Sequence, residues 1–303
     1  MTFGTATTAA GVREYLVSVR GGRPAPEEVV LEFERRYDVV GRSPLLEITL
    51  AQAAGLQAAL NAAHGEGSFE VAVGMLHSAP GIDAAAAGLV EHGARRIVGL
   101  VLAPQYSSLI LSGYERAVSA LRGLHPDVQI SVAGPWHTLP EWTGCLAERV
   151  ESALQALPEH TRATIPVIFT AHSLPKAVVE RDPAYIEQLR QTAAAVAQSC
   201  ALDASRWVFA YQSAGHTAEE WLRPDVKELL PGMRAGGHDA VLVAPVQFVA
   251  DHLEILYDLD VAAADEARSY GVQMHRIAMP NATPAFIAAL TAVVERELSA
   301  AYR

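Results

Sequence analysis

Residues 167–175 read Val-Ile-Phe-Thr-Ala-His-Ser-Leu-Pro, a short apolar run that ends on polar residues and a proline. The first four residues are apolar or β-branched without alternation, which is typical of a strand buried on both faces of a parallel sheet. A histidine then follows at position 172, near the carboxyl end of that strand. In open parallel sheets, ligands bind at this edge. The stretch therefore predicts an α/β fold and the edge at which its chemistry lies.

Other stretches have the same continuous apolar character, and helical patterns separate them. The predicted strands cover residues 71–76, 97–103, 129–133, 207–211 and 240–244, and predicted helices cover 84–93, 109–123, 185–200 and 224–236. Strands that alternate with helices favour a parallel sheet with helices on both faces. The pattern runs twice, so we predict two doubly wound domains, residues 1–139 and 140–303. A final helix after Pro284 carries one apolar stripe, and we expect it to pack back on the N-terminal domain.

The chain is acidic and has enough apolar side chains for a large core. Of its 303 residues 50% are hydrophobic, 34 are acidic and 23 are basic, which gives a formal net charge of −11. A nucleic-acid partner is disfavoured, because phosphate contacts need an excess of Lys and Arg. No apolar run approaches the roughly 20 residues that cross a bilayer, and no signal peptide is recognisable. We therefore expect a cytoplasmic protein without a transmembrane segment.

Absent motifs narrow the chemistry further. The sequence has no Gly-rich dinucleotide fingerprint after a strand, no phosphate-binding P-loop and no Gly-x-Ser-x-Gly nucleophile motif. Its two cysteines, Cys145 and Cys200, cannot supply the four thiolates of an iron–sulfur cluster. We therefore expect no iron–sulfur cluster and no tightly bound cofactor.

His172, in the opening stretch, is the first candidate for chemistry. A neutral imidazole at a strand end binds transition metals and accepts protons near neutral pH. A histidine that is merely hydrogen-bonded at the end of its strand explains this stretch equally well.

Carboxylates gather after another predicted strand, in residues 251–266. Glu254 and Asp258 are four residues apart, so they share one face of the helix predicted there. Two carboxylates on one face repel each other unless a cation or a proton lies between them. A solvated helix face is the alternative for this pair. A strand-end histidine and one such carboxylate would together hold a divalent ion with open coordination positions.

Arginines gather near the amino end of this acidic chain, at Arg20, Arg23, Arg35, Arg36 and Arg42. The planar guanidinium group pairs well with carboxylates, so the set would suit the docking of an anionic ligand. Ordinary salt bridges on a solvated helix are the alternative, and for any single arginine they are the simpler explanation.

The motifs around His172 and Glu254 resemble the signatures of the ferrochelatase family, the metal-inserting enzymes of haem synthesis. Residues 169–175 resemble the signature around the family's catalytic histidine, and residues 245–258 resemble the signature with its catalytic glutamate. Further similar stretches follow in order along the chain, at residues 4–5, 42–45, 103–107, 211–213, 221–225 and 279–281. The resemblance implies two Rossmann-like domains with a porphyrin-binding cleft between them.

The resemblance also implies roles for single residues. His172 and Glu254 would be the catalytic pair and the iron site, and Asp258 would be the next carboxylate on the path of the metal. The residues that it places around the porphyrin are Phe3, Arg20, Arg36, Tyr37, Ser43, His77 and Tyr114. The bacterial coproporphyrin branch of the family has a tyrosine where this chain has Phe3. Which member of the catalytic pair takes protons and which binds metal stays open.

The implied reaction is the insertion of Fe²⁺ into a porphyrin with release of two pyrrole protons. The four propionates of coproporphyrin III suit an arginine-rich rim, whereas protoporphyrin IX has only two. We therefore predict a coproporphyrin III ferrochelatase that forms coproheme, with protoporphyrin IX as the alternative substrate. A chelatase for cobalt or another metal, and an inactive tetrapyrrole-binding relative, are further alternatives.

The expected partners are the two substrates, porphyrin and ferrous iron. Transient contacts with neighbouring haem-pathway enzymes are also expected. For the chain itself we expect a monomer.

Overall fold

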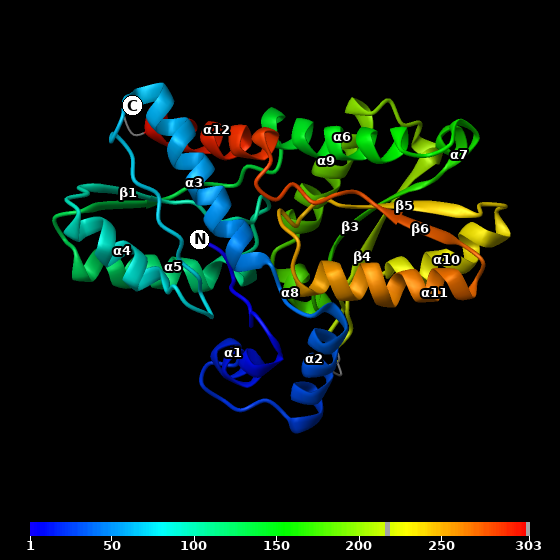
Figure 1. Cartoon of the computed structure of the whole chain (residues 1–303), viewed down its shortest axis with the longest axis horizontal. Coiled ribbons are helices and arrows are strands. Elements are labelled where there is room, and N and C mark those ends of the chain that lie inside the picture. The colour runs from blue at the N-terminus through cyan, green and yellow to red at the C-terminus, as the bar shows by residue number, and fades with distance from the viewer. Residues whose placement is uncertain (216–218, 301–303) are drawn as a thin grey trace. The chain divides into compact units, whose positions relative to one another are not determined.

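The computed structural model describes residues 1–215 and 219–300 and shows helices around parallel strands (Figure 1). The chain divides into two compact units. The first unit comprises Met1–Trp136, Ala250–Leu253 and the segment from Asn281 onward, and the second comprises His137–Val249 and Glu254–Pro280. The last helix therefore belongs to the first unit, although it follows the second along the chain. No described helix combines the length and the apolar character that a bilayer crossing requires.

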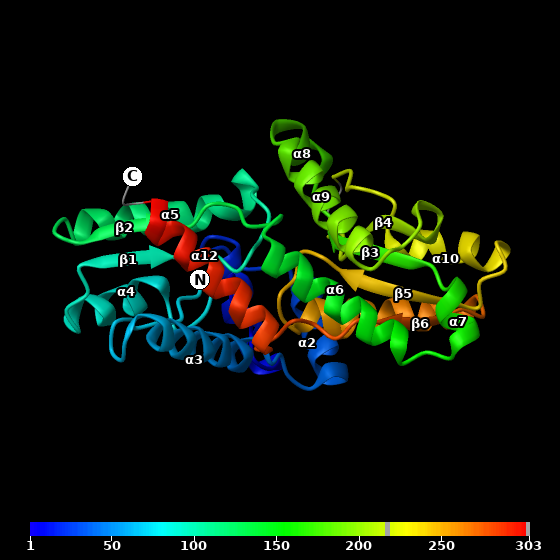
Figure 2. The same ribbon diagram turned by 90° about the horizontal axis from the view of Figure 1, so that it is seen from above.

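In the first unit a short parallel sheet has helices on both faces. Helices α4 and α5 cover one face and share a buried apolar cluster with the strands. Helices α3 and α12 pack against each other on the other face (Figure 1, Figure 2). These elements are β1 (Arg96–Gly99), β2 (Gln129–Val132), α3 (Leu45–His64), α4 (Ile82–Glu91), α5 (Ser108–Leu124) and α12 (Pro284–Ala300). Three further helices lie near the amino end: η1 (Ala9–Gly11), α1 (Val12–Val19) and α2 (Glu27–Val40).

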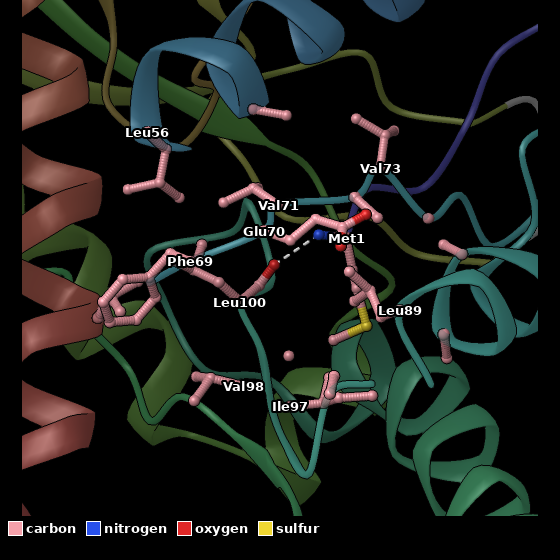
Figure 3. A pocket seen from close by; sticks show the side chains of 18 of the residues that line it. Met1, Leu56, Phe69, Glu70, Val71, Val73, Leu89, Ile97, Val98 and Leu100 are labelled. Atoms are coloured by element: carbon pink, nitrogen blue, oxygen red, sulfur yellow. Dashed lines mark hydrogen bonds between the residues drawn. The ribbon is translucent and has the colours of Figure 1, made fainter. Parts of the chain in front are cut away.

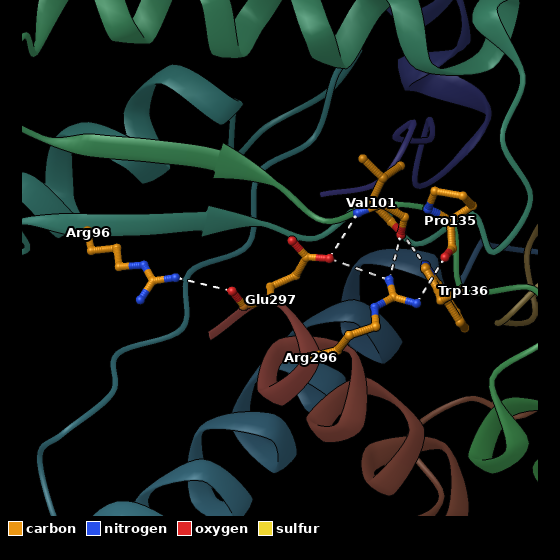
Figure 4. Close-up of polar contacts among 7 residues, drawn as sticks. Arg96, Val101, Pro135, Trp136, Arg296 and Glu297 are labelled. Carbon is orange, nitrogen blue, oxygen red and sulfur yellow. Dashed lines mark hydrogen bonds and ion pairs between the residues drawn. The ribbon is translucent and has the colours of Figure 1, made fainter. Parts of the chain in front are cut away.

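The carboxyl end of α12 is tied to the loop after β2 by its own charged side chains (Figure 4). Arg296 donates to the carbonyl oxygens of Gly134 and Pro135, each at 3.0 Å. The carboxylate of Glu297 accepts from the backbone N–H of Gly134 at 3.2 Å. Its backbone carbonyl accepts from Arg96, on β1, also at 3.2 Å. Polar bonds to β1 and to the loop after β2 therefore hold the helix on this sheet in addition to its apolar stripe.

Residues 71–76 were predicted as a strand, and this prediction is wrong. The segment makes isolated bridges instead of a continuous ladder, one of them between Met75 and Thr2. The N–H of Val71 donates to the side chain of Gln57 at 2.8 Å instead of to a neighbouring strand. The apolar pattern is that of a buried strand, but among the described residues no strand runs alongside it.

The second unit is built on a four-stranded parallel sheet in the order β4-β3-β5-β6. Helices α6 and α9 pack together on one face, and apolar residues of α10, α11 and η3 form the buried cluster on the other. The strands are β3 (Val167–His172), β4 (Trp207–Gln212), β5 (Ala240–Pro245) and β6 (Gln273–Arg276). The helices are α6 (Pro140–Gln155), α7 (Glu159–Thr164), α8 (Lys176–Arg181), α9 (Ala184–Ser199), η2 (Ala204–Arg206), α10 (Val226–Ala235), η3 (Glu254–Ala263) and α11 (Ala264–Ser269).

Two elements of the second unit differ from the sequence prediction. Strand β6 was missed because its residues, Gln-Met-His-Arg, form no apolar run, as befits a strand at the edge of the sheet. The helix predicted around Glu254 is a π-helix, η3, with hydrogen bonds from each residue to the fifth along. Such helices are rare and are often found at functional sites. The first residue of η3 is Glu254, one of the predicted site residues.

We expect Phe286→Ala to lower the free energy of unfolding by about 3–5 kcal/mol, because it removes a fully buried ring from α12. Phe286 is 0% exposed and packs near Trp136, with 6.3 Å between ring centroids. Denaturant unfolding followed by circular dichroism measures the change. Leu31→Ala on α2, at a side chain that is 54% exposed, is the control. Equal losses in the two variants would contradict the placement of α12 in the first unit.

Candidate active site

Strand β3 carries His172 to the carboxyl edge of the second sheet. The five preceding strand residues are buried, whereas the His172 side chain is 25% exposed. Its Nδ1 donates a hydrogen bond to the carbonyl oxygen of Ser173. Because a carbonyl oxygen only accepts, Nδ1 carries a proton, so the nitrogen that can present an electron pair is Nε2. The aromatic rings of Phe248 and Trp221 lie at centroid distances of 6.3 and 6.5 Å from the imidazole.

Glu254, the first residue of η3, brings a carboxylate to the same place. Its Oε2 lies 3.5 Å from Nε2 of His172, and its side chain is 38% exposed. This separation is long for a hydrogen bond, so the two groups are not locked to each other. Metal bonds of about 2.1 Å from each atom would meet at one ion. The sequence prediction that a strand-end histidine and this carboxylate come together is therefore matched by the geometry of the second unit.

A buried polar brace holds the backbone of His172. The side-chain oxygen of Gln247 accepts the backbone N–H of His172 at 2.8 Å. The amide nitrogen of Gln247 donates to the hydroxyl of Tyr185 at 2.6 Å. Tyr185 is 1% exposed, and burial raises the pKa of its phenol, so the hydroxyl stays neutral. The bonds of the brace reach the backbone N–H of His172 and do not involve Nε2 of its ring.

A second set of bonds holds the turn after His172. The N–H of Ser173 donates to the carbonyl oxygen of Gln212 at 2.8 Å, and its hydroxyl donates to the carbonyl oxygen of Leu222 at 3.0 Å. The side chain of Gln212 in turn accepts from Thr170 at 2.7 Å. Backbone carbonyls of the last residue of β4 and of Leu222 therefore fix Ser173, whose own carbonyl sets the tautomer of His172.

The sequence predicted which residues follow the strands, but it did not predict that Gln247 and Tyr185 hold the backbone of His172. Gln247 follows β5 and belongs to the motif around Glu254, so its position was visible. Tyr185 lies in α9 and carries no signal in the sequence, because only the packing of that helix brings it to Gln247.

Asp258 lies four residues after Glu254 in η3 and is partly buried. Another acid of this helix, Asp260, is neutralised by Arg276 through bonds of 2.7 and 2.8 Å. The acidic residues of η3 therefore differ in their surroundings, because the charge of Asp260 is balanced by Arg276. In the described ranges, 1–215 and 219–300, no group of three or more His, Cys, Asp and Glu side chains could hold a metal ion.

In the first unit the predicted residues Phe3 and His77 form one cluster. Their rings meet edge to face with 4.6 Å between centroids. The backbone N–H of His77 donates to the carbonyl oxygen of Phe3 at 2.9 Å. Nδ1 of His77 is 3.2 Å from the hydroxyl of Ser18. Burial lowers the pKa of His77, which favours its neutral form. Phe3 is 43% exposed, so this cluster reaches the surface of the unit.

Two other predicted residues, Tyr37 and Ser43, are buried beside residues 5–7. The Tyr37 hydroxyl donates to the carbonyl oxygen of Ala6 and lies 3.1 Å from the hydroxyl of Thr5. The N–H of Ser43 donates to the carbonyl oxygen of Thr7 at 3.0 Å. The hydroxyl of Ser43 is buried without a hydrogen-bond partner among the described residues. The side chain of Tyr37 and the backbone of Ser43 therefore support the loop that follows Phe3.

Arg20 and Arg36 lie in different electrostatic surroundings. Nε of Arg36 donates to Glu32 at 3.0 Å, and Arg35 binds the same carboxylate. The hydrogen bond from Arg35, together with Arg36, lowers the pKa of Glu32 to about 2. Arg20 donates only to a carbonyl oxygen, that of Pro24 at 3.3 Å, and pairs with no carboxylate of the described residues. Its charge is therefore available to an anion.

Tyr114, which the resemblance places at the porphyrin, lies in the core of the first unit. It is 3% exposed and belongs to the apolar cluster of α4, α5 and the strands. Burial raises the pKa of its phenol. In this structure its ring packs with the core and not at the surface.

The sequence model of the ferrochelatase family matches residues 1–298. The chain belongs to the ferrochelatase family. A protein of Herpetosiphon aurantiacus named ferrochelatase is 36% identical over 296 residues, which cover 97% of this chain and 96% of that protein. A coproporphyrin III ferrochelatase of Geobacillus kaustophilus is 35% identical over 297 residues, covering 97% and 93%. This ferrochelatase is thus a lyase-class enzyme of haem biosynthesis that inserts metal into a porphyrin.

A solved structure supports the fold. The structure titled SirB from Bacillus subtilis with Fe³⁺ has a TM-score of 0.58 and covers 80% of this chain and 87% of that one, at 14% sequence identity. At this identity the likeness concerns the arrangement of parallel sheets and helices alone. The predicted α/β class with parallel sheets flanked by helices is confirmed.

We expect Gln247→Leu to lower kcat for metal insertion about 10-fold with KM for porphyrin nearly unchanged, because small misplacements of a reacting group are costly. The change removes both bonds of the brace and keeps a side chain of similar size. Steady-state absorbance of metalloporphyrin measures both constants. Gln198→Leu, at an exposed position of α9, is the matched control. An unchanged kcat in Gln247→Leu would show that the brace does not determine the position of the His172 side chain.

Proposed function

We propose that this ferrochelatase inserts Fe²⁺ into coproporphyrin III, and that His172 and Glu254 bind the ion and take up the pyrrole protons. The observation that carries the proposal is the 3.5 Å between Nε2 of His172 and Oε2 of Glu254. Fe²⁺ accepts both imidazole and carboxylate ligands. Coproheme would be the product.

The overall reaction sets what the residues must do. A free-base porphyrin gives up two N–H protons, and Fe²⁺ takes their place among the four nitrogens. A neutral imidazole nitrogen and a carboxylate are each both a metal ligand and a base. Two protein donors leave most positions around the ion to water and then to the porphyrin nitrogens. The partial exposure of both side chains, 25% and 38%, leaves a way in for the substrates.

The tautomer of His172 favours this use. Since Ser173 holds the proton on Nδ1, the lone pair on Nε2 is directed away from the backbone, and that nitrogen lies 3.5 Å from the carboxylate. Two electron-rich atoms at this separation are stabilised by a proton or a cation between them. We propose that Asp258, further along η3, is part of the route by which the ion arrives.

Coproporphyrin III is the proposed substrate for two reasons. The relative from Geobacillus kaustophilus, similar over 97% of this chain, is named for that porphyrin. In addition, Arg20 has a guanidinium group that no described carboxylate neutralises. We propose that it meets a propionate of the substrate, together with Phe3 and His77 as apolar contacts at the ring. A porphyrin with four propionates gains more from such a cation than one with two.

We expect His172→Ala and Glu254→Gln each to lower turnover of Fe²⁺ and porphyrin by about 100-fold or more, because each removes a ligand and base at the reacting atoms. Porphyrin binding, measured by fluorescence quenching, should persist in both. His160→Ala and Glu159→Gln are the matched controls, since both side chains are exposed at α7. Full turnover in the two site variants would reject the iron site.

We expect the wild type to turn over coproporphyrin III with a higher kcat/KM than protoporphyrin IX. Arg20→Ala should raise KM for coproporphyrin III about 10-fold through the loss of one charge-assisted contact, with a smaller effect for protoporphyrin IX. Arg35→Ala, which removes an exposed arginine already paired with Glu32, is the control. Faster turnover of protoporphyrin IX by the wild type would contradict coproporphyrin III as the preferred substrate. It would not affect the proposal that His172 and Glu254 bind the iron.

A further inference from the structure

The interiors of the two units are packed differently. In the first unit a cavity of about 620 Å³ lies between segment 69–74 and β1, where apolar side chains leave space unfilled (Figure 3). In the second unit helix η3 lies directly on the sheet, with Ile255 and Leu259 fully buried in the apolar cluster that includes residues of β3 and β5. The helix that carries Glu254 therefore rests on fully buried apolar side chains.

Apolar contacts hold η3 on the sheet, but they do not by themselves specify where it lies along its own axis. Ile255, Leu259 and Ala263 recur at every fourth residue and are buried, so one side of the helix is apolar. The free energy gained by burying such side chains depends on the area removed from water and has no preferred direction. A directional contact specifies the position of the helix more sharply.

Arg276 supplies a directional contact at the carboxyl end of β6. Its Nε donates to Oδ1 of Asp260 at 2.7 Å, and its Nη2 donates to Oδ2 of the same carboxylate at 2.8 Å. Its Nη1 donates to the carbonyl oxygen of Ile277, also at 2.8 Å. Two parallel bonds between a guanidinium group and a carboxylate fix both the distance and the orientation of the two groups. We refer to this doubly bonded pair as the Arg276–Asp260 fork.

Both members of the Arg276–Asp260 fork belong to well-anchored elements of the second unit. Arg276 pairs in register with Val243 of β5, and the N–H of Ile277 donates to the carbonyl oxygen of Val243 at 3.1 Å. Asp260 directly follows the buried Leu259 of η3. The Arg276 side chain is 14% exposed and that of Asp260 is 35% exposed, so the fork is partly shielded from water. It therefore ties η3 to the edge strand more firmly than an exposed ion pair would.

The position of the Glu254 carboxylate depends on the helix that carries it. Its Oε2 lies 3.5 Å from Nε2 of His172, which is too far for a hydrogen bond to hold the two groups together. Metal bonds of about 2.1 Å from both atoms tolerate little change in this separation. A displacement of about 1 Å of a reacting group can lower a rate by about 100-fold. The placement of η3 therefore matters for the reaction.

We propose that Arg276 is a positioning residue for metal insertion, which holds η3 through the Arg276–Asp260 fork and so sets the distance between Glu254 and His172. Arg276 acts through Asp260 and the helix and does not itself bind the ion. The inference rests on the proposed function, in which His172 and Glu254 bind Fe²⁺.

Charge balance is the other role that the ion pair could have. Arg276 balances the negative charge of Asp260 on a helix that also carries Glu254 and Asp258. A lysine at position 276 would balance this charge equally well, but its single ammonium group cannot form two parallel bonds to a carboxylate. Arg276→Lys therefore separates positioning from charge balance.

Steady-state kinetics of Arg276→Lys test the proposal. We expect kcat for Fe²⁺ insertion to fall about 10-fold, because Glu254 is misplaced, with KM for porphyrin and the Tm nearly unchanged. Arg234→Lys is the matched control, since Arg234 of α10 forms an exposed ion pair with Asp239, ahead of β5. The control should retain the wild-type kcat. A wild-type kcat in Arg276→Lys would overturn the proposal.

Replacing both members of the fork by leucine gives a second test in a chain that stays folded. Exchange of a shielded ion pair for apolar residues often leaves stability unchanged or raises it. The double variant Arg276→Leu, Asp260→Leu should therefore keep a Tm close to that of the wild type, while its kcat falls by about 10-fold or more. The double variant Arg234→Leu, Asp239→Leu is the control. A wild-type kcat, or a loss of kcat only in step with a loss of folded protein, would overturn the positioning role.

Glu254→Gln, measured alongside, separates this inference from the proposed function. In the Glu254→Gln background, Arg276→Lys should lower the residual rate no further, because the two changes act through the same carboxylate. A further 10-fold loss in that background would show that Arg276 acts elsewhere. Low turnover in Glu254→Gln with wild-type turnover in the fork variants would reject the role of Arg276 alone. Full turnover in Glu254→Gln would reject the iron site and this inference together.

Discussion

The burial of β3 on both faces is the constraint on which the site depends. Residues 167–171 have no access to water, and their peptide groups are taken up by β4 and β5. Only at its carboxyl end can this strand present a side chain to a substrate, and the residue at that end is His172. Because neighbouring strands are parallel, their carboxyl ends bring Gln212 and Gln247 to the same edge.

The polar groups at this edge act mainly on the backbone. Gln247 and Tyr185 hold the N–H of His172, while Ser173 holds its Nδ1 proton. The result is an imidazole whose Nε2 is left to face Glu254. The proposed catalytic pair is therefore loosely coupled within itself, while His172 is held firmly by the fold. This combination suits a metal that is cargo, since the ion must be bound and then released.

The alternation of apolar strands and helices was readable along the chain, and most strands and helices of the structure follow it. It failed at residues 71–76, where the apolar run was present and the pairing was not. It also failed at β6, a polar edge strand. Both failures have one cause, because a strand is defined by its neighbours and local composition reports only burial. Among the site residues, His172 and Glu254 were found through their motifs, whereas Tyr185 was invisible in α9.

The sequence by itself determined the α/β class, the strand-end histidine, the carboxylates of residues 251–266 and the family, because these follow from residue types and their order. Only the tertiary structure decided which of these groups meet. It placed Glu254 at 3.5 Å from His172 and gave Asp260 to Arg276. It also left Arg20 without a described carboxylate partner while Glu32 holds Arg36. Distances between side chains far apart in the chain depend on packing, and packing is a property of the whole fold.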